Sequence, residues 1–406
     1  MLGVALLSVA CNKDWIPSKD KGLEGQNVKK MAVGTASKLF VLNEGGMGSN
    51  NSTLDFLRFS DSTYVNGAFK KMNPDIAAGL GDVGNDIAVK GNEVWIVVNN
   101  SGLVEVISAI DESEIAAIPV PTPRYVAFDS KYAYVTSWAG AHATGSYDAS
   151  GNYTVTDSSN PKGQVYRINM SSKKVEGTVE VGYQPEGIAY YNGKLYVANS
   201  GGISSQLPPS YSYDNTVSII DAASFKVEQT VEVEVNLKNV YSSGDGVIYV
   251  TTLGNYWNVH TGLYYFYADN PAVVRKAGVN QQEPSGDLQV SCSCVCGDTV
   301  YCIGTADEFD WSASHTYYVW AFKIVDKSID RGAIIKYPHE LKGTPYGLAL
   351  VDSPSTGGIT YHYLVVGDAG DYFNPGTVSC FEFDFGSLQR IWSVTAGVCP
   401  GHFAIW

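Results

Sequence analysis

The chain has 406 residues, including 27 Tyr, 14 Phe, 8 Trp and 42 Gly, and amphipathic helical runs are hard to find. Such a composition is typical of an all-β protein, and repeat β folds commonly reach this length as one unit. The formal net charge of −14 at pH 7 argues against a nucleic-acid partner, which would need clustered Lys and Arg. After residue 11, no apolar run approaches the roughly 20 residues that a membrane helix requires.

The chain begins with a short apolar stretch, residues 1–10, that runs directly into Cys11. This stretch resembles a bacterial lipoprotein signal, in which Ala10 would mark the cleavage site and the Cys11 thiol would receive the lipid. Because the stretch is short and lacks a basic start, a truncated secretion signal with an incidental cysteine is the alternative. We expect residues 1–11 to be signal and lipidation site, and the polar residues 12–37 to be a tether.

The first regular strand is expected at Lys38–Asn43, and it resembles the second strand of a hairpin that lacks its first strand. The missing partner is found at the other end of the chain, where Pro400–Trp406 matches Pro185–Tyr191 and is followed by no second strand. Pairing of the two terminal segments would close a ring and remove its exposed sheet edges.

Between these ends, a hairpin pattern recurs. Its clearest copy joins Gly187–Tyr191 to Lys194–Asn199 through Asn192-Gly193, the strongest short hairpin signal in a sequence. A third and a fourth strand follow each hairpin, as in a β-propeller blade. We therefore predict that residues 38–406 form a seven-bladed β-propeller closed by its N- and C-terminal strands. The other hairpins are predicted at Asn85–Val98, Arg124–Thr136, Leu237–Thr252, Ser291–Gly304 and Tyr346–Val366.

Most of the predicted units are longer than the about 40–45 residues of a compact blade. The additional residues lie mainly between the second and third strands, for example at 138–162 and 200–215. In a four-stranded blade this connection always emerges on the same face of the disc. One-sided loop growth on a rigid scaffold predicts a binding face.

The segments "VGYQPEGIAYYNGKLYVANSGG" and "NTVSIIDAASFKVEQTVEV" resemble the repeats of YVTN, or surface-layer-type, seven-bladed propellers. The opening "KLFVLNEGG" and the long tyrosine-containing loops resemble those of secreted propeller lipoproteins. With the lipoprotein-like start, the chain is similar to secreted propeller lipoproteins of gut Gram-negative bacteria. The best understood of these are surface cobalamin-binding lipoproteins. The resemblance implies capture of cobalamin and its transfer to a TonB-dependent transporter by a protein that is lipid-anchored in the outer membrane and faces the cell exterior.

The long loops are rich in aromatic side chains, which give a bulky amphipathic ligand a large contact area. Short polar side chains at the ends of the second strands could hydrogen-bond amide arms such as those of a corrin ring. Alternatively, the aromatic residues pack their own loops and the polar residues make turns. The candidate ligand-binding residues are Asn43, Glu44, Asn99, Trp138, Tyr147, Asn199, Tyr211, Tyr213, Tyr256, Trp257, Trp311, His315, Asp368, Tyr372 and Phe373.

Four cysteines invite a sharper hypothesis, because Cys292, Cys294 and Cys296 alternate along one predicted strand and Cys302 lies on the next. Metal binding is conceivable, but the spacing is not that of a zinc ribbon, and small buried residues are the favoured interpretation. Export would also permit a disulfide such as Cys380–Cys399 or Cys294–Cys302.

Catalytic motifs are hard to find. The six histidines are scattered without a metal-binding spacing, and no G-x-S-x-G elbow is present. Acidic groups such as Asp368 with Asp371 could bind calcium or act as acid and base, but solvated loops are favoured. We therefore predict no catalytic residue, no metal and no cofactor. The alternatives to cobalamin capture are an interaction module for protein or surface glycan and a propeller enzyme of lactonase or lyase type.

Overall fold

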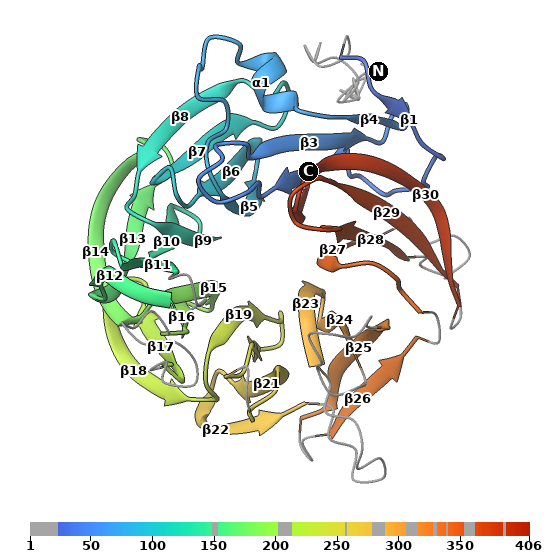
Figure 1. Ribbon diagram of the computed structural model, residues 1–406. Helices are drawn as coiled ribbons and strands as arrows, with labels where there is room; N and C mark the ends of the chain where they lie inside the picture. Colours follow the sequence, from blue (N-terminus) through green and yellow to red (C-terminus); the bar gives the residue numbers. More distant parts are fainter. Residues whose placement is uncertain are drawn as a thin grey trace, which may run out of the picture.

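The protein is a ring of β-sheets, seen along its axis in Figure 1. The computed structural model describes residues 23–147, 153–201, 213–255, 258–277, 289–305, 316–327, 331–337, 340–352, 362–384 and 387–406. These residues form eight sheets, of which seven are blades around a central channel, and this confirms the predicted seven-bladed propeller. No described helix is long and apolar enough to cross a membrane.

Each blade is an antiparallel sheet whose first strand lies innermost, and the inner strands of successive blades contact one another around the ring. The strands of blades 1 to 3 are β31 (Pro400–Ile405), β2 (Lys38–Asn43), β3 (Thr53–Arg58), β4 (Thr63–Val65) and β1 (Gln26–Asn27); β5 (Gly84–Lys90), β6 (Glu93–Val98), β7 (Leu103–Ser108) and β8 (Glu114–Pro119); and β9 (Pro123–Phe128), β10 (Tyr132–Ser137), β13 (Lys162–Asn169) and β14 (Lys174–Tyr183).

The remaining four blades follow the same plan. Their strands are β15 (Pro185–Tyr191), β16 (Lys194–Asn199), β17 (Thr216–Asp221) and β18 (Lys226–Glu232); β19 (Leu237–Ser242), β20 (Val247–Thr252), β21 (Gly262–Tyr267) and β22 (Asn270–Lys276); β23 (Gln289–Cys296), β24 (Thr299–Thr305), β25 (Tyr317–Asp326) and β26 (Arg331–Lys336); and β27 (Pro345–Asp352), β28 (His362–Asp368), β29 (Pro375–Asp384) and β30 (Ser387–Val398).

The alternating pattern of the strands builds apolar layers between neighbouring blades, because successive side chains point to opposite faces of a sheet. Between blades 1 and 2, for example, Phe40 and Phe56 pack against Val94 and Ile96. On the other face of β2, Leu39 and residues of the same strand pack against blade 7. Every blade therefore depends on both neighbours for its core.

Three elements differ from the sequence analysis. A hairpin of β11 (His142–Tyr147) and β12 (Tyr153–Ser159) occupies the expected loop of blade 3, and a short helix, α1 (Ala68–Met72), packs on β3. Residues 23–37, expected within the tether, instead lie against the propeller. Met31 is buried between blades 1 and 7, and β1 pairs with β4, because spaced apolar residues find a surface that only the closed ring provides.

The ring closes through β2 and β31, which pair from Leu39 opposite Ile405 to Asn43 opposite Pro400 (Figure 1). This pairing confirms the closure predicted from the two chain ends. Lys38 reinforces it, because its buried Nζ donates to the Glu112 carboxylate at 2.6 Å and lies 5.5 Å from the centre of the Trp406 ring. The Lys38 side chain thus connects β2 of blade 1 with Glu112 of blade 2 and with Trp406 after β31.

We predict that Lys38→Met lowers the free energy of unfolding by about 3–5 kcal/mol, since it leaves the buried Glu112 carboxylate without its cation. Lys194→Met is the matched control, because Lys194 pairs with Glu228 at the surface and such pairs contribute about 0–1 kcal/mol. Chemical denaturation of both variants measures the difference. Equal losses would contradict the role given to Lys38.

Candidate functional site

The channel is shaped by an irregularity that recurs in all seven inner strands. In each strand the register with its partner shifts near the start, as between Pro185 and Ile188 in β15 and between Leu237 and Val240 in β19. Such β-bulges bend the strand and redirect side chains. The bulges carry Asn85, Arg124 and Tyr125, Glu186 and Gly187, Lys238 and Asn239, Ser291, Tyr346, and Gly401.

Neighbouring bulges lie so close that some positions accept only glycine. A Cβ on Gly187 would lie 2.6 Å from the Val240 nitrogen, and one on Gly347 would lie 2.0 Å from the Gly401 oxygen. Thr136 and Thr251, opposite two of the bulges, replace lost ladder bonds, since their hydroxyls accept the Tyr125 and Asn239 N–H groups. The Thr136 hydroxyl also donates to the Glu186 carbonyl of the next blade. The inner ring is therefore a tightly fitted, rigid structure.

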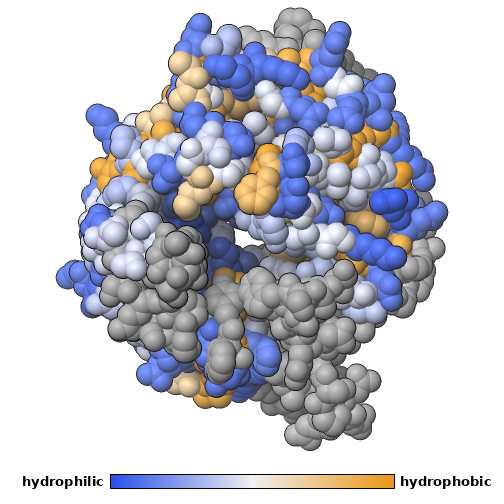
Figure 2. Space-filling view, in the orientation of Figure 1, coloured by the Kyte–Doolittle hydropathy of each residue, from blue (hydrophilic) through white to orange (hydrophobic). Residues whose placement is uncertain are grey.

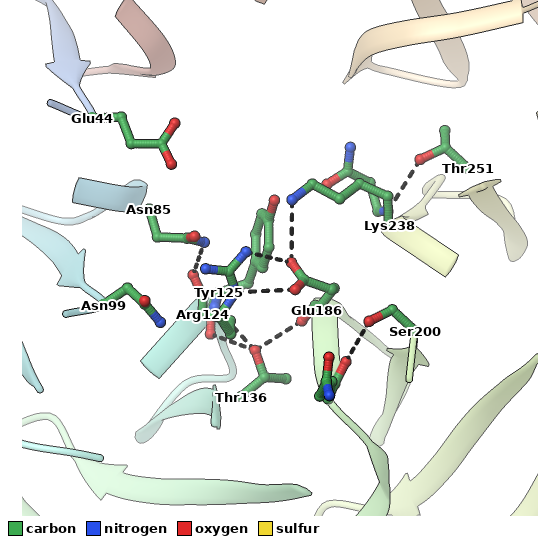
Figure 3. A network of polar contacts seen from close by, with 12 residues as sticks. Glu44, Asn85, Asn99, Arg124, Tyr125, Thr136, Glu186, Ser200, Lys238 and Thr251 are labelled. Carbon is green, nitrogen blue, oxygen red and sulfur yellow. Dashed lines mark hydrogen bonds and ion pairs between the residues drawn. The ribbon is translucent and has the colours of Figure 1, made fainter. Parts of the chain in front are cut away.

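Three charged side chains from consecutive bulges meet at the channel (Figure 3). The Glu186 carboxylate accepts from Arg124 Nε at 3.1 Å and Nη2 at 3.0 Å, and its Oε2 accepts from Lys238 Nζ at 3.2 Å. Glu186 is almost fully buried, whereas the Lys238 side chain is 31% exposed. The ion triad thus joins blades 3, 4 and 5 and carries one excess positive charge.

Burial and the charges of the ion triad shift the pKa values of the titratable groups around the channel. Burial would raise the pKa of Glu186, but the charges of Arg124 and Lys238 outweigh it and hold that pKa below its usual value. Burial lowers the pKa of His402 to about 3, and the same two cations add to the shift, so the imidazole is neutral. Burial raises the pKa of Asp86 to about 6, although its carboxylate accepts the Val126 N–H at 2.9 Å.

A second group gathers on the loop face, by which we mean the face on which the second strands of the blades end. Tyr346 of β27 donates a hydrogen bond to the Glu44 carboxylate, and its ring meets that of Tyr372 edge-on at 5.8 Å. Phe373 beside it is 85% exposed, and Met47 in the loop after β2 is 76% exposed. Apolar side chains of the loops after β2 and β28 are therefore exposed, and Figure 2 shows the opening of the channel.

The loop that carries Tyr372 and Phe373 is held by its own polar residues. Asp371 Oδ1 accepts the Phe373 and Asn374 N–H groups, and these bonds lower the pKa of Asp371 to about 2. Asp368 accepts the Thr344 and Gly370 N–H groups. Tyr372 has a φ of 66°, a conformation that a bulky residue rarely adopts and that fixed surroundings must hold. The loop thus holds Tyr372 and Phe373 in a defined position.

The three asparagines predicted as ligand-binding residues at the ends of the second strands are buried rather than exposed. Asn43, Asn99 and Asn199 are buried, and their side-chain nitrogens donate to Thr53, to the Pro123 carbonyl, and to Thr216 and Ser218. These amides tie strands and blades together.

The other predicted residues are distributed as follows. The ring of Trp138 lies 4.5 Å from the Arg124 guanidinium, and Tyr213 is half-buried and bridges to Gly201. The structure therefore brings Glu44, Asp368, Tyr372 and Phe373 together, and it places Trp138 at the ion triad. Tyr147 ends β11, and the structure does not describe its side chain. Cys11, Tyr211, Tyr256, Trp257, Trp311 and His315 lie outside the described residues.

The six cysteines that the structure describes have free thiols. Cys302 lies opposite Ser293 across the β23–β24 pair, and it packs towards blade 5 while Cys292 and Cys294 pack towards blade 7. Cys302 and Cys294 are thus on opposite faces of one sheet, which does not fit a bond between them. Burial raises the pKa of Cys292 to about 12, so this thiol is protonated. Within the described ranges, no three His, Cys, Asp or Glu side chains form a possible metal site.

Sequence reasoning missed the channel residues Arg124, Tyr125, Glu186, Lys238 and Tyr346. A signal for four of them was present, because Arg124, Glu186, Lys238 and Tyr346 each follow the Pro or Leu that begins an inner strand. Tyr125 is the next residue after Arg124. Aligning the repeats at this position would have shown a variable, mostly charged or polar column. The bulge that turns this column towards the channel is not apparent in any one repeat.

No known family model matches the chain, and no curated protein matches it. Solved structures do resemble it. A structure of hydrazine synthase from Kuenenia stuttgartiensis is 14% identical with a TM-score of 0.56, covering 79% of this chain and 88% of that one. AztD from Citrobacter koseri is 12% identical with a TM-score of 0.50, covering 91% and 97%. At these identities the likeness supports the fold alone.

We predict that Glu186→Gln lowers the free energy of unfolding by about 3 kcal/mol at pH 7, because Arg124 and Lys238 then face each other without an anion. The control is Glu228→Gln at the surface, with an expected loss of less than about 1 kcal/mol. Denaturant titrations at several pH values provide the measurement.

The pH dependence has a definite sign. The folded-state pKa of Glu186 lies below its usual value of 4.5, so the stabilisation is complete above pH 4.5 and is lost as the pH falls through the folded-state pKa. The difference between the wild type and Glu186→Gln should therefore shrink below pH 4.5. A difference that stays constant into acid would contradict the charge-based account.

Proposed function

We propose that the protein is a non-catalytic binding propeller that captures a bulky amphipathic ligand on its loop face. One observation carries the proposal: Phe373 and Tyr372 stand out from this face on a loop whose backbone is fixed by hydrogen bonds to Asp368 and Asp371. An exposed Phe gains free energy when a ligand covers it. Because the loop is already ordered, binding loses little of that gain to conformational entropy.

The most specific form of the proposal is cobalamin capture. A corrin ring offers an apolar face to Phe373, Tyr372 and Met47, while its amide arms can meet polar groups such as Glu44 and the Tyr346 hydroxyl. The resemblance of the repeats to cobalamin-binding propeller lipoproteins supports this ligand. In this form the protein is anchored in the outer membrane through Cys11, faces the exterior and passes cobalamin to a TonB-dependent transporter. Capture and transfer require a shaped surface and no reactive group.

Two titratable groups of the channel do not favour an enzyme. The channel carboxylate of Glu186 is held by two cations, and the channel imidazole of His402 has its pKa lowered to about 3. Neither is poised to exchange a proton near neutral pH, as a general acid or base must be. Capture of a surface glycan remains the alternative ligand class for the same aromatic residues.

We expect calorimetric titration of the protein with cyanocobalamin to show one-to-one binding, and Phe373→Ala to weaken it at least about tenfold, or ~1.4 kcal/mol. Ile405→Ala is the matched control, because Ile405 is also exposed but lies at the opposite end of β31 from the loop face. Absence of heat up to high micromolar concentrations would exclude cobalamin. Equal effects of the two substitutions would place the ligand elsewhere.

A further inference from the structure

The channel itself is hollow. A cavity of about 470 Å³ is lined by residues from all seven inner strands, and the opening is visible in Figure 2. The walls differ in chemistry: Lys238, Tyr125 and His402 lie on one part of the lining, and β23 and β27 supply Cys292, Cys294 and Leu348. We propose that this cavity binds a small amphipathic anion, whose carboxylate or phosphate head contacts Lys238 and whose apolar part lies against β23 and β27.

The head-group contact rests on Lys238. Among the described lining residues, Lys238 carries the one fully charged cationic side chain, and it is 31% exposed. An ammonium group has three donors, and the structure engages one with Glu186 at 3.2 Å and another with the Tyr125 side chain, which leaves the third for a ligand. Glu186 is at the same time held by two nitrogens of Arg124, so its single charge is shared between two cations. Lys238 can therefore donate to an anion in the channel without giving up its present partners.

The neighbouring groups show the sign of the local potential. His402 lies in the same cavity, with its ring 6.4 Å from that of Tyr125. After burial, the charges of Lys238 and Arg124 are the causes that lower the pKa of His402. A potential that opposes a proton on His402 favours an anion at the same place. The Tyr125 hydroxyl can donate as well, because burial raises its pKa and keeps it protonated.

The other wall suits an apolar group. The side chains that β23 and β27 contribute to the described lining are uncharged. Ser291, Ser293 and Tyr346 bring hydroxyl groups, whereas Cys292, Cys294, Val295 and Leu348 supply the apolar part of this wall. The Cys292 thiol is kept protonated by burial. A cavity with one cationic side and one apolar side discriminates by both charge and hydrophobicity.

Asp86 is the carboxylate of the lining and acts against an anion. Its carboxylate accepts the Val126 N–H, and an amide oxygen in the same place could accept that bond equally. Asp86→Asn therefore removes a repulsive charge while keeping the shape of the wall. The two channel charges thus give variants with opposite expected effects.

The test is calorimetric titration of the full-length protein with octanoate, octyl phosphate and 1-octanol, which share a chain and differ in the head group. At least one anion should bind about tenfold more tightly than octanol, and the tighter one identifies the head as carboxylate or phosphate. Lys238→Met should weaken the binding of that anion about tenfold and leave the binding of octanol unchanged. Lys194→Met is the matched surface control and should change neither.

Asp86→Asn keeps the inference falsifiable if Lys238→Met does not fold, since it should tighten binding of the anion. The inference is overturned if neither anion binds at millimolar concentration, or if octanol binds as tightly as the anions. It is also overturned if Asp86→Asn weakens the binding of the anions or leaves it unchanged. The inference does not rest on the proposed function. No cobalamin enters the test, so cobalamin capture and the channel site can fail separately.

Discussion

The pairing of β2 with β31 is the constraint on which the rest of the structure depends. A blade has apolar residues on both faces and covers them only by packing on two neighbours, so a ring that stays open leaves two such faces in water. Closure joins the ends of a 406-residue chain and determines how many inner strands surround the channel. The buried Lys38–Glu112 pair and the contact of Lys38 with Trp406 lie at this closure.

Closure brings the inner strands so close together that their bulges form a continuous ring. Gly187 and Gly347 allow that approach, and the ion triad of Arg124, Glu186 and Lys238 joins three neighbouring bulges. A buried ion network contributes less to net stability than to the definition of one arrangement, because desolvation offsets much of the attraction. The same rigidity serves the loop face, since Tyr372 rests on Tyr346 of an inner strand. The ring and the loop face are thus connected through this aromatic contact.

Most of the fold could be predicted from local patterns. Asn192-Gly193 adopts positive φ at both residues, as its hairpin requires, and Pro400–Ile405 pairs where the repeat alignment places it. The site was harder to predict from the sequence, because its geometry depends on contacts between blades. Asn43 and Asn199 carry polar side chains that suit a ligand, and in the structure their side-chain nitrogens donate hydrogen bonds to Thr53 and Thr216. Glu186 has the character of a surface residue, and only the bulge turns it into the channel.

The central claim is that a rigid propeller binds its ligand on the loop face. Hydrogen–deuterium exchange of the whole chain, with and without saturating cyanocobalamin, tests it most directly. The account predicts slower exchange in residues 44–52 and 369–374, with unchanged exchange in the opposite turns at residues 191–194 and 244–246. Protection of those turns, or a change spread evenly over all seven blades, would contradict the claim.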